Sequence, residues 1–239
     1  MIEQLATTSS TSAELTQRLR SNVSIPEGHW LIADRQTAGR GRQGREWFDG
    51  VGNFIGSTVV QPAFGDPPLS SLALLAGLAL SEALAGFLPP PQRAVLKWPN
   101  DVMIGKAKLA GILLERVGDA VVIGIGVNLA AAPNLPDRET IALSAFGPAP
   151  DRDVFAARLA ACLAEDLARW RSYGIGPVIA RWLAAAHSIG TPLEVGEPGE
   201  PPVKGTFAGL TDDGALLLAL PRATTRVIHA GEVRLATPD

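Results

Sequence analysis

The sequence predicts an α+β protein in two parts, a larger domain of helices and strands over residues 1–189 and a small β-barrel over residues 190–239. Along the first part, apolar residues follow helical and strand periods in turn. The composition then shifts at Ser188–Pro192, and closely spaced short strands and turns follow. This spacing is typical of a small β-barrel, so we expect a domain boundary near residue 190.

Length and composition limit the classes of protein to consider. The chain has 239 residues, 46% of them hydrophobic, which suits one sizeable domain and a small second one. The polar N-terminus, Met1–Ser12, lacks the basic and apolar segments of a signal peptide. The one cysteine, Cys162, lies among Ala and Leu and is expected to be a small core residue, which excludes an intramolecular disulfide. These features predict a cytoplasmic protein.

The elements of the first domain follow from hydrophobic periods and turn signals. The most apolar stretch, Leu69–Leu88, contains Ser and Glu side chains and ends at prolines, so it predicts a buried helix and not a membrane span. Other helices are expected over Glu14–Arg20, Asp153–Tyr173 and Val178–His187. Strands are expected over Trp30–Asp34, Asn53–Gln61, Val95–Trp98, Lys108–Arg116 and Ala120–Leu129, the last two as a hairpin.

Short alternating segments predict the strands of the second domain. A hairpin turn is expected at Asp212-Asp213-Gly214. The strands are expected over Leu193–Val195, Val203–Leu210, Ala215–Leu220, Thr225–Ala230 and Glu232–Ala236.

In the first domain, a loop rich in glycine and arginine follows the strand expected over Trp30–Asp34. Residues 39–45 hold three glycines and three arginines. Glycine lets a backbone approach a ligand closely, and arginine supplies a planar, always-charged donor for carboxylate or phosphate. The segment predicts an adaptable anion-binding loop, because neither the Walker A motif nor a good dinucleotide fingerprint is present. A solvated basic loop and an RNA-binding Gly-Arg patch remain alternatives.

A second polar group stands where the strand Val95–Trp98 ends. The turn Lys97-Trp98-Pro99-Asn100-Asp101 combines an ammonium, an amide and a carboxylate, and its proline fixes the backbone. Lys108 begins an apolar strand, where a lone lysine is costly to bury without an anion. Taken alone, Lys108 also fits an edge residue whose ammonium reaches solvent. Together with the Gly-Arg loop, it predicts a site for anionic groups.

The strand Ala120–Leu129 has two glycines at alternate positions, Gly124 and Gly126. Glycines with this spacing remove the side chains from one face of a strand. We expect them to leave room for a flat ligand, and close packing of a helix on the sheet is the alternative.

These motifs together resemble the biotin–protein ligase family. The resemblance implies a biotin/lipoate ligase-like catalytic domain with a mixed sheet, and the C-terminal strands agree with the family's SH3-like end domain. Where the family usually has Ser-Thr-Asn, this chain has Ser10-Thr11-Ser12, and no DNA-binding winged helix is expected before Ser10. The matching segments occur in the family's order and are Ser10-Thr11, Gln36–Gly44, Trp47, Lys97–Asp101, Lys108–Leu113 and Gly124–Asn128.

The resemblance implies a ligase that converts biotin and ATP to biotinyl-5′-AMP and pyrophosphate. The biotin then passes to a lysine of a biotin carboxyl carrier protein of the acetyl-CoA carboxylase type. Arg42 and Lys108 are the implied catalytic residues, and Mg²⁺ is expected near Asn100 or Asp101. Biotin would be held by Ser10, Thr11, Gln36, Arg40, Gly41, Arg42 and Lys108, and ATP or the adenylate by Trp47, Asn100, Asn128 and Lys108.

The charges of the reactants explain why such residues are needed. The carboxylate of biotin and the α-phosphate of ATP repel each other by roughly 4 kcal/mol at about 4 Å and an effective dielectric of about 20. Arg40, Arg42, Lys108 and Mg²⁺ offset this repulsion. In the transfer step, only about one carrier lysine in 2,500 has a neutral amine at pH 7. A base would help, and Asp101 is the candidate.

Two other functions remain as alternatives. A lipoate or octanoate ligase or transferase would share the fold, but the Gly-Arg loop and the helical position of Cys162 disfavour it. A Gly-Arg nucleic-acid-binding module would need wider basic clustering and more aromatic residues than the 5% present, and the net charge is −3. We therefore expect no nucleic acid or membrane partner, and either a monomer or a homodimer.

Overall fold

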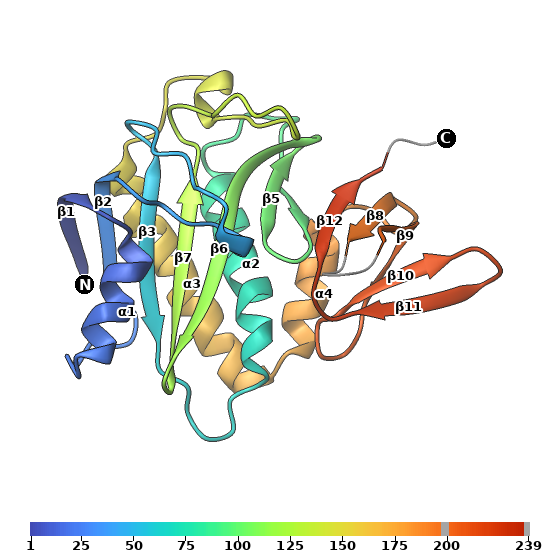
Figure 1. The fold of residues 1–239 in the computed structure, drawn as a ribbon, viewed down its shortest axis with the longest axis horizontal. Coiled ribbons are helices and arrows are strands. Elements are labelled where there is room, and N and C mark those ends of the chain that lie inside the picture. Colours follow the sequence, from blue (N-terminus) through green and yellow to red (C-terminus); the bar gives the residue numbers. More distant parts are fainter. Residues whose placement is uncertain (197–200, 237–239) are drawn as a thin grey trace.

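A large sheet with helices on both faces stands beside a smaller sheet in the computed structural model, which describes residues 1–196 and 201–236 (Figure 1). Most of the chain belongs to the larger part. In chain order, that part consists of β1 (Ile2–Thr8), α1 (Thr11–Arg20), β2 (Trp30–Gln36), β3 (Phe54–Val60), α2 (Leu72–Ala85), β4 (Val95–Lys97), β5 (Asp101–Ile104), β6 (Ala107–Val117), β7 (Ala120–Val127), α3 (Arg152–Tyr173) and α4 (Gly176–Ala185).

The strands of the large sheet lie in the order β1-β2-β3-β7-β6-β5-β4. β1 pairs with β2 in parallel, and every other neighbouring pair is antiparallel. The expected mixed sheet is therefore confirmed. β6 and β7 form the expected hairpin, and the central strands β3 and β7 are buried along their whole length.

Alternate residues of β7 face two separate apolar cores, one on each side of the sheet. Ile123 packs in the large core with α2 and α3, whereas Val122 packs in the smaller core with Leu15 of α1. Gly124 and Gly126 lie on the same face as Val122 because strand side chains alternate. The α1 face of the sheet thus has no side chains at these two positions, and the candidate site lies there.

The long apolar helix was predicted over Leu69–Leu88, and the structure has a short 3₁₀ turn at Leu69–Ser71 followed by α2. α2 is apolar on nearly all sides because it packs against the sheet, α3 and α4. Cys162 of α3 is partly buried against this core, as expected. Within residues 1–196 and 201–236, no helix combines the length and apolar character that crossing a bilayer requires.

Three local differences from the prediction have physical reasons. β1 was not predicted, because it is an edge strand with mostly exposed, polar residues. α1 begins at Thr11 and not at Glu14, since the Ser10 hydroxyl caps it by accepting from the Ala13 N–H. β5 was read only as the turn after Lys97, although it pairs with both β4 and β6.

The smaller part is a five-stranded antiparallel sheet that packs on the end of the larger one (Figure 1). Its apolar side chains join the large core, and Trp182 of α4 packs edge-to-face against Phe207, with 6.3 Å between the ring centroids. The indole of Trp98 donates to the Gly214 carbonyl at 3.1 Å, so the predicted turn at residues 212–214 touches the Lys97–Asp101 turn. The strands are β8 (Pro192–Gly196), β9 (Val203–Leu210), β10 (Leu216–Leu220), β11 (Thr224–Ile228) and β12 (Glu232–Leu235), in the order β11-β10-β9-β8-β12.

Candidate functional site

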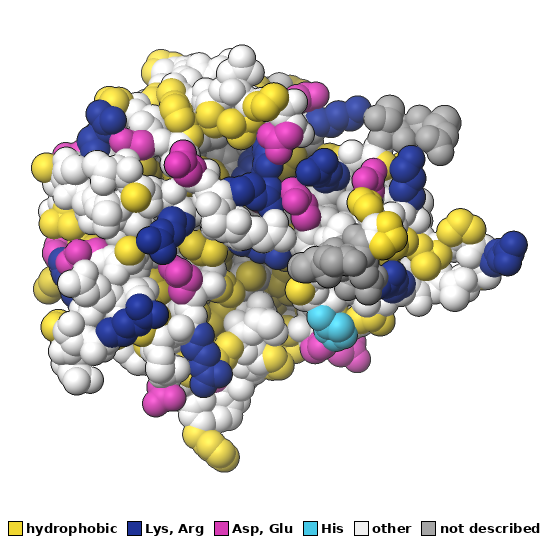
Figure 2. Space-filling model, in the orientation of Figure 1, with side chains coloured by type: hydrophobic (Ala, Val, Ile, Leu, Met, Phe, Trp, Pro, Cys, Tyr) yellow, Lys and Arg dark blue, Asp and Glu magenta, His cyan; other side chains and the backbone are white. Residues whose placement is uncertain are grey.

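A cavity of about 1030 Å³ opens between the α1 face of the large sheet and β12 of the small one. Figure 2 shows Lys and Arg side chains gathered around a hollow near the centre of this face, with carboxylates among them. Eight Lys and Arg and six Asp and Glu residues line the cavity, so cations outnumber anions there although the whole chain is acidic. All the predicted site residues line it: Ser10, Thr11, Gln36, Arg40, Gly41, Arg42, Trp47, Asn100, Asp101, Lys108 and Asn128.

One end of the cavity is a buried cluster of hydroxyl and amide groups. Gln36 Oε1 accepts from the backbone N–H of Thr11 at 2.7 Å and from its hydroxyl at 3.1 Å. The Thr11 hydroxyl is also 2.8 Å from the hydroxyl of Ser57, which is 2.9 Å from that of Ser12. The first turn of α1 therefore meets β2 and β3 in one hydrogen-bonded group, and this end of the cavity is polar and neutral.

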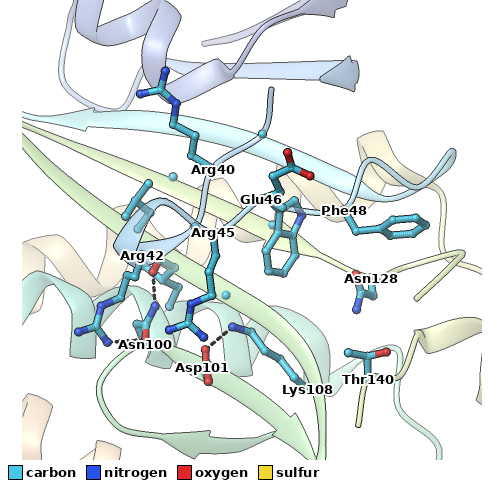
Figure 3. Close-up of a pocket in the computed structure, with 18 of the residues that line it drawn as sticks. Arg40, Arg42, Arg45, Glu46, Phe48, Asn100, Asp101, Lys108, Asn128 and Thr140 are labelled. Carbon is cyan, nitrogen blue, oxygen red and sulfur yellow. Dashed lines mark hydrogen bonds and ion pairs between the residues drawn. The ribbon is translucent and has the colours of Figure 1, made fainter. Parts of the chain in front are cut away.

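The Gly-Arg loop folds back on itself above the cavity. The Gly41 N–H donates to the Arg45 carbonyl at 2.7 Å, and the Trp47 N–H donates to the Gly39 carbonyl at 3.0 Å. Gly44, with φ +73°, takes the left-handed conformation that glycine favours. Arg40 points away from the Asp101–Lys108 pair (Figure 3).

Two arginines tie this loop to other parts of the cavity wall. The Arg42 guanidinium donates to Asn100 Oδ1 at 3.1 Å and to the Gly231 carbonyl at 3.2 Å. Arg45 forms an ion pair with Glu232 at 2.9 Å. Burial lowers the pKa of Arg42 from its ordinary value, but the guanidinium stays charged at neutral pH. The loop is thus attached to both the Lys97–Asp101 turn and β12.

Asp101, on β5, lies between two lysines, and β7 and β6 separate β5 from β3 and the hydroxyl cluster. Its oxygens are 2.8 Å from Lys97 Nζ and 2.5 Å from Lys108 Nζ. Burial raises the pKa of Asp101, but the charges and hydrogen bonds of Lys108 and Lys97 outweigh burial and hold the pKa at about 2. Burial lowers the pKa of Lys108, and Asp101 opposes this. A carboxylate held in this way is a poor proton acceptor, so its contacts favour a positioning role over the predicted role as a base.

Asn100 and Asp101 have the oxygen ligands that Mg²⁺ prefers, but their partners here are cations or donors. Asn100 Oδ1 accepts from Arg42, and Asn100 Nδ2 donates to the Ile112 carbonyl at 2.6 Å. Both oxygens of Asp101 are paired with lysines. Over the described part of the chain, no cluster of three His, Cys, Asp or Glu side chains is suited to a metal ion. The two residues therefore do not fit a direct Mg²⁺ site in this arrangement.

The room left by the glycines of β6 and β7 is filled by the side chain of Trp47. A Cβ atom at Gly126 would lie 2.2 Å from the indole, and one at Gly111 would lie 3.0 Å from it. Lys108 Nζ is 5.6 Å from the centroid of the indole ring. The alternating glycines were predicted to leave room for a flat ligand; in the structure Trp47 occupies the space at Gly126 and the Ser12 hydroxyl occupies the space at Gly124.

Two buried polar atoms in the cavity wall have no hydrogen-bond partner within the described residues, Trp47 Nε1 and Asn128 Oδ1. Asn128 Nδ2 donates to the Ile141 carbonyl at 3.2 Å, which fixes the direction of the amide. Unpaired buried groups are costly, so these atoms are points where a ligand donor or acceptor gains most.

Several lining residues were not predicted. Ser57 lies in an apolar strand, and only its position on the α1 face, opposite Gly124, marks it. Glu232 and Arg234 of β12 also line the cavity, although nothing in the sequence indicates that the C-terminal strand reaches the Gly-Arg loop. The ion pair between Arg45 and Glu232 spans 187 residues. Arg45 and Lys97 belong to predicted motifs but had no individual role, and the other unpredicted lining residues with charged or polar side chains include Ser12, Lys106, Arg138 and Thr140.

Comparison with known proteins agrees with this fold. Residues 5–128 match the Biotin/lipoate A/B protein ligase family, and residues 189–235 match the Biotin protein ligase C terminal domain. A biotin–[acetyl-CoA-carboxylase] ligase from Paracoccus denitrificans is 40% identical over 96% of this chain and 98% of that protein. One from Mycobacterium tuberculosis is 37% identical over 97% of this chain and 88% of that protein.

The solved structures extend the likeness to three dimensions. The biotin protein ligase from Aquifex aeolicus in complex with biotin and ATP has a TM-score of 0.85 and 26% identity over 98% of this chain and 99% of that chain. Since both the sequence and the fold are alike over nearly the whole length, the chain belongs to the biotin protein ligase branch of the biotin/lipoate A/B protein ligase family.

Proposed function

We propose that this protein activates biotin with ATP and then biotinylates a lysine of a biotin carboxyl carrier protein of the acetyl-CoA carboxylase type. One observation carries the proposal. A single cavity is lined by a neutral hydrogen-bonding cluster at β2 and β3 and, across β7, by the cations of the Lys97–Asp101 turn and β6. Biotin has a matching shape, because a neutral urea lies at one end of the molecule and a carboxylate at the other. The relatives named as biotin ligases support the same reaction.

The urea of biotin lies at the buried cluster of Ser10, Thr11 and Gln36. A urea has one carbonyl acceptor and two N–H donors, and it carries no charge. Buried hydroxyl and amide groups satisfy such a group without the desolvation cost of an ion. All three residues are at most 7% exposed, so water competes little for these hydrogen bonds.

The carboxylate of biotin and the α-phosphate of ATP meet at the cations of the Lys97–Asp101 turn and β6. One carboxylate oxygen attacks the α-phosphorus, the bond from that phosphorus to the bridging oxygen breaks, and pyrophosphate leaves with the bonding electrons. Arg42 and Lys108 lower the repulsion between the two anions and stabilise the charge on phosphorus. The backbone of Gly41 and the guanidinium of Arg40 close over the same groups when the loop rearranges around substrates.

The nucleotide lies against Trp47, near the amides of Asn100 and Asn128. The unpartnered Asn128 Oδ1 is suited to accept from an amino group of the base. Asn100 and Asp101 accept from Arg42, Lys97 and Lys108, so any Mg²⁺ that accompanies ATP would take its ligands from groups other than these two side chains. In the second step the neutral amine of the carrier lysine attacks the acyl carbon, the bond from that carbon to the phosphate oxygen breaks, AMP leaves with the bonding electrons, and the amine releases a proton to solvent. Asp101 holds Lys108 in place through both steps.

The remaining expectations belong to the same proposal. Residues 1–189 form the catalytic domain and residues 190–239 the SH3-like domain. The protein acts in the cytoplasm as a monomer or homodimer, without nucleic acid or membrane partners. The carrier protein approaches the open side of the cavity, where its lysine reaches the adenylate.

Exchange of labelled pyrophosphate into ATP tests the first step. The purified chain is incubated with ATP and labelled pyrophosphate, with biotin, lipoate, octanoate or no acid. Exchange that depends on biotin alone is expected. Exchange that depends on lipoate or octanoate would assign the chain to the other branch of the fold, and exchange with none of the acids would contradict the proposal.

A further inference from the structure

The hydroxyl cluster at the neutral end of the cavity has a hydrogen-bond direction that its geometry fixes. A backbone N–H is only a donor, so the atom of Gln36 that lies 2.7 Å from the Thr11 N–H must be the carbonyl oxygen. The Thr11 hydroxyl lies 3.1 Å from the same oxygen, so it must donate its one hydrogen bond to that oxygen. The Gln36 amide is thereby oriented without reference to any ligand.

The remaining members follow one by one. Because the Thr11 proton is used, the 2.8 Å contact with Ser57 requires the Ser57 hydroxyl to donate to Thr11. The Ser57 proton is then used, so the 2.9 Å contact with Ser12 requires Ser12 to donate to Ser57. The protons run in one direction, from Ser12 to Ser57 to Thr11 to Gln36. We call these four residues the hydroxyl relay.

This direction decides what the cavity offers a ligand. The hydroxyl of Ser12 already donates its hydrogen bond to Ser57, so towards a ligand Ser12 can act only as an acceptor. Both lone pairs of Gln36 Oε1 are occupied, so Gln36 is left with its Nε2 donors, which lie beside Gly39. Ser10 accepts from Ala13 N–H and keeps its own proton to donate. The wall therefore presents donors at one place and an acceptor at another.

We propose that Ser12 is a further specificity residue at this end of the cavity, accepting from one ring N–H of the urea, and that Ser57 is the positioning residue that keeps Ser12 an acceptor. The proposal rests on the proposed function, in which biotin supplies the urea. Neither Ser12 nor Ser57 had a predicted role.

Packing around the hydroxyl relay supports a dedicated structure. Ser12, Thr11 and Ser57 are at most 7% exposed and come from α1 and β3, which are far apart in the sequence. A Cβ at Gly124 would lie 2.4 Å from the Ser12 hydroxyl and 3.5 Å from that of Ser57. Gly124 thus leaves the space that the Ser12 hydroxyl occupies, and a larger side chain there would displace it.

The test compares biotin with its two cyclic carbamate analogues, in each of which one ring N–H is replaced by oxygen. In the analogue whose ring oxygen faces Ser12, two acceptor atoms, the ring oxygen and the Ser12 oxygen, face each other without a hydrogen between them. Its dissociation constant from the unmodified enzyme, measured by calorimetry, is expected to exceed that of biotin by at least about tenfold. In Ser57→Ala, Ser12 regains a free proton and can donate to the ring oxygen. In this variant the ratio of the dissociation constant of the carbamate to that of biotin is expected to fall to about threefold or less.

Thr58→Ala is the matched control, because Thr58 is the next residue of β3 and its buried hydroxyl donates to the His29 carbonyl at 2.8 Å, away from the cavity. This variant is expected to keep the full ratio. A merely structural role of Ser57 would weaken biotin and the carbamate equally, and an unchanged ratio in Ser57→Ala would overturn the proposal. Should Ser57→Ala fail to fold, Ser12→Ala serves instead, and a ratio that stays at its original value there overturns it equally.

The outcomes also separate this proposal from the proposed function. An unmodified enzyme that binds biotin and catalyses pyrophosphate exchange, but shows no preference over either carbamate, contradicts the hydroxyl relay alone. An unmodified enzyme that binds no biotin contradicts both.

Discussion

Lys108 Nζ lies 2.5 Å from Asp101 Oδ1, in the wall of the cavity where the two anionic substrates are proposed to meet. A buried lysine without a partner tends to lose its proton, and a neutral Lys108 would offset no repulsion. Asp101 therefore opposes the loss of this proton and fixes the direction of the Lys108 side chain. This relationship assigns Asp101 to both half-reactions, whereas a base would matter only in the second.

Replacement of Asp101 separates these two roles. In Asp101→Asn, Lys97 and Lys108 lose their shared anion, so biotinyl-AMP formation is expected to slow by about tenfold to a hundredfold. Single-turnover formation of biotinyl-AMP, followed by transfer from chemically supplied biotinyl-AMP, measures the two steps separately. Normal adenylate formation with loss of transfer alone would support a base and contradict the positioning role.

The lowered pKa of Asp101 also predicts how the free energy of unfolding depends on pH. The pKa of Asp101 is about 2 in the folded chain, below its ordinary value near 3.9. The ion pairs therefore stabilise the fold fully above about pH 4, and this contribution is lost as the pH falls towards 2. Urea unfolding between pH 2 and 6 should show a decline at the acid end that is smaller in Asp101→Asn. Parallel pH curves for the two proteins would show that Asp101 contributes nothing to acid sensitivity.

The ion pair between Arg45 and Glu232 is expected to keep the Gly-Arg loop attached to β12. Both side chains are part-exposed, so the pair contributes at most about 1 kcal/mol to overall stability, but it acts directly on the loop. Arg45→Glu or Glu232→Arg alone should release biotinyl-AMP into solution several times faster. The double variant Arg45→Glu with Glu232→Arg should recover most of the retention. Release that is as fast in the double variant as in the single ones would exclude the pair as the cause.

Trp47 and Gly126 are expected to act as one unit. A Cβ at Gly126 would lie 2.2 Å from the indole, so Gly126→Ala must expel the ring from its place on the sheet. Both Gly126→Ala and Trp47→Ala should therefore raise the KM for ATP, by about tenfold if the ring packs on the base. Gly176→Ala, at the start of α4 with open space around its Cβ position, is a control for glycine replacement. A Gly126→Ala enzyme with the original KM would show that the indole position does not matter.

The sequence was sufficient to predict much of the fold because most elements carry local signals. The apolar run that becomes α2 and the turn at residues 212–214 depend on residues close in the chain. β1 has no such signal, since its pairing with β2 is non-local and its side chains are mostly exposed. Strands of this kind are recognised only once their neighbour is known.

The candidate site divides in the same way. Arg42, Lys108 and Gln36 stand in motifs that can be read from the chain, and the cavity brings them together. Ser57 and Glu232 stand in no motif, because their parts depend on contacts across the fold, with Ser12 and Arg45. The direction of the hydroxyl relay and the opposing charges around Asp101 likewise follow from distances that no sequence pattern contains.

Biotin transfer in a mixture of purified components tests the central claim most directly. The chain is mixed with biotin, ATP and a biotin carboxyl carrier domain, and the intact mass of the carrier is followed with time. The account predicts one added biotinyl group on one lysine, dependent on ATP and restored without ATP by biotinyl-AMP. It also predicts that Lys108→Ala slows labelling from ATP and biotin by about a hundredfold or more. A carrier that stays unlabelled with either ATP or biotinyl-AMP would contradict the account.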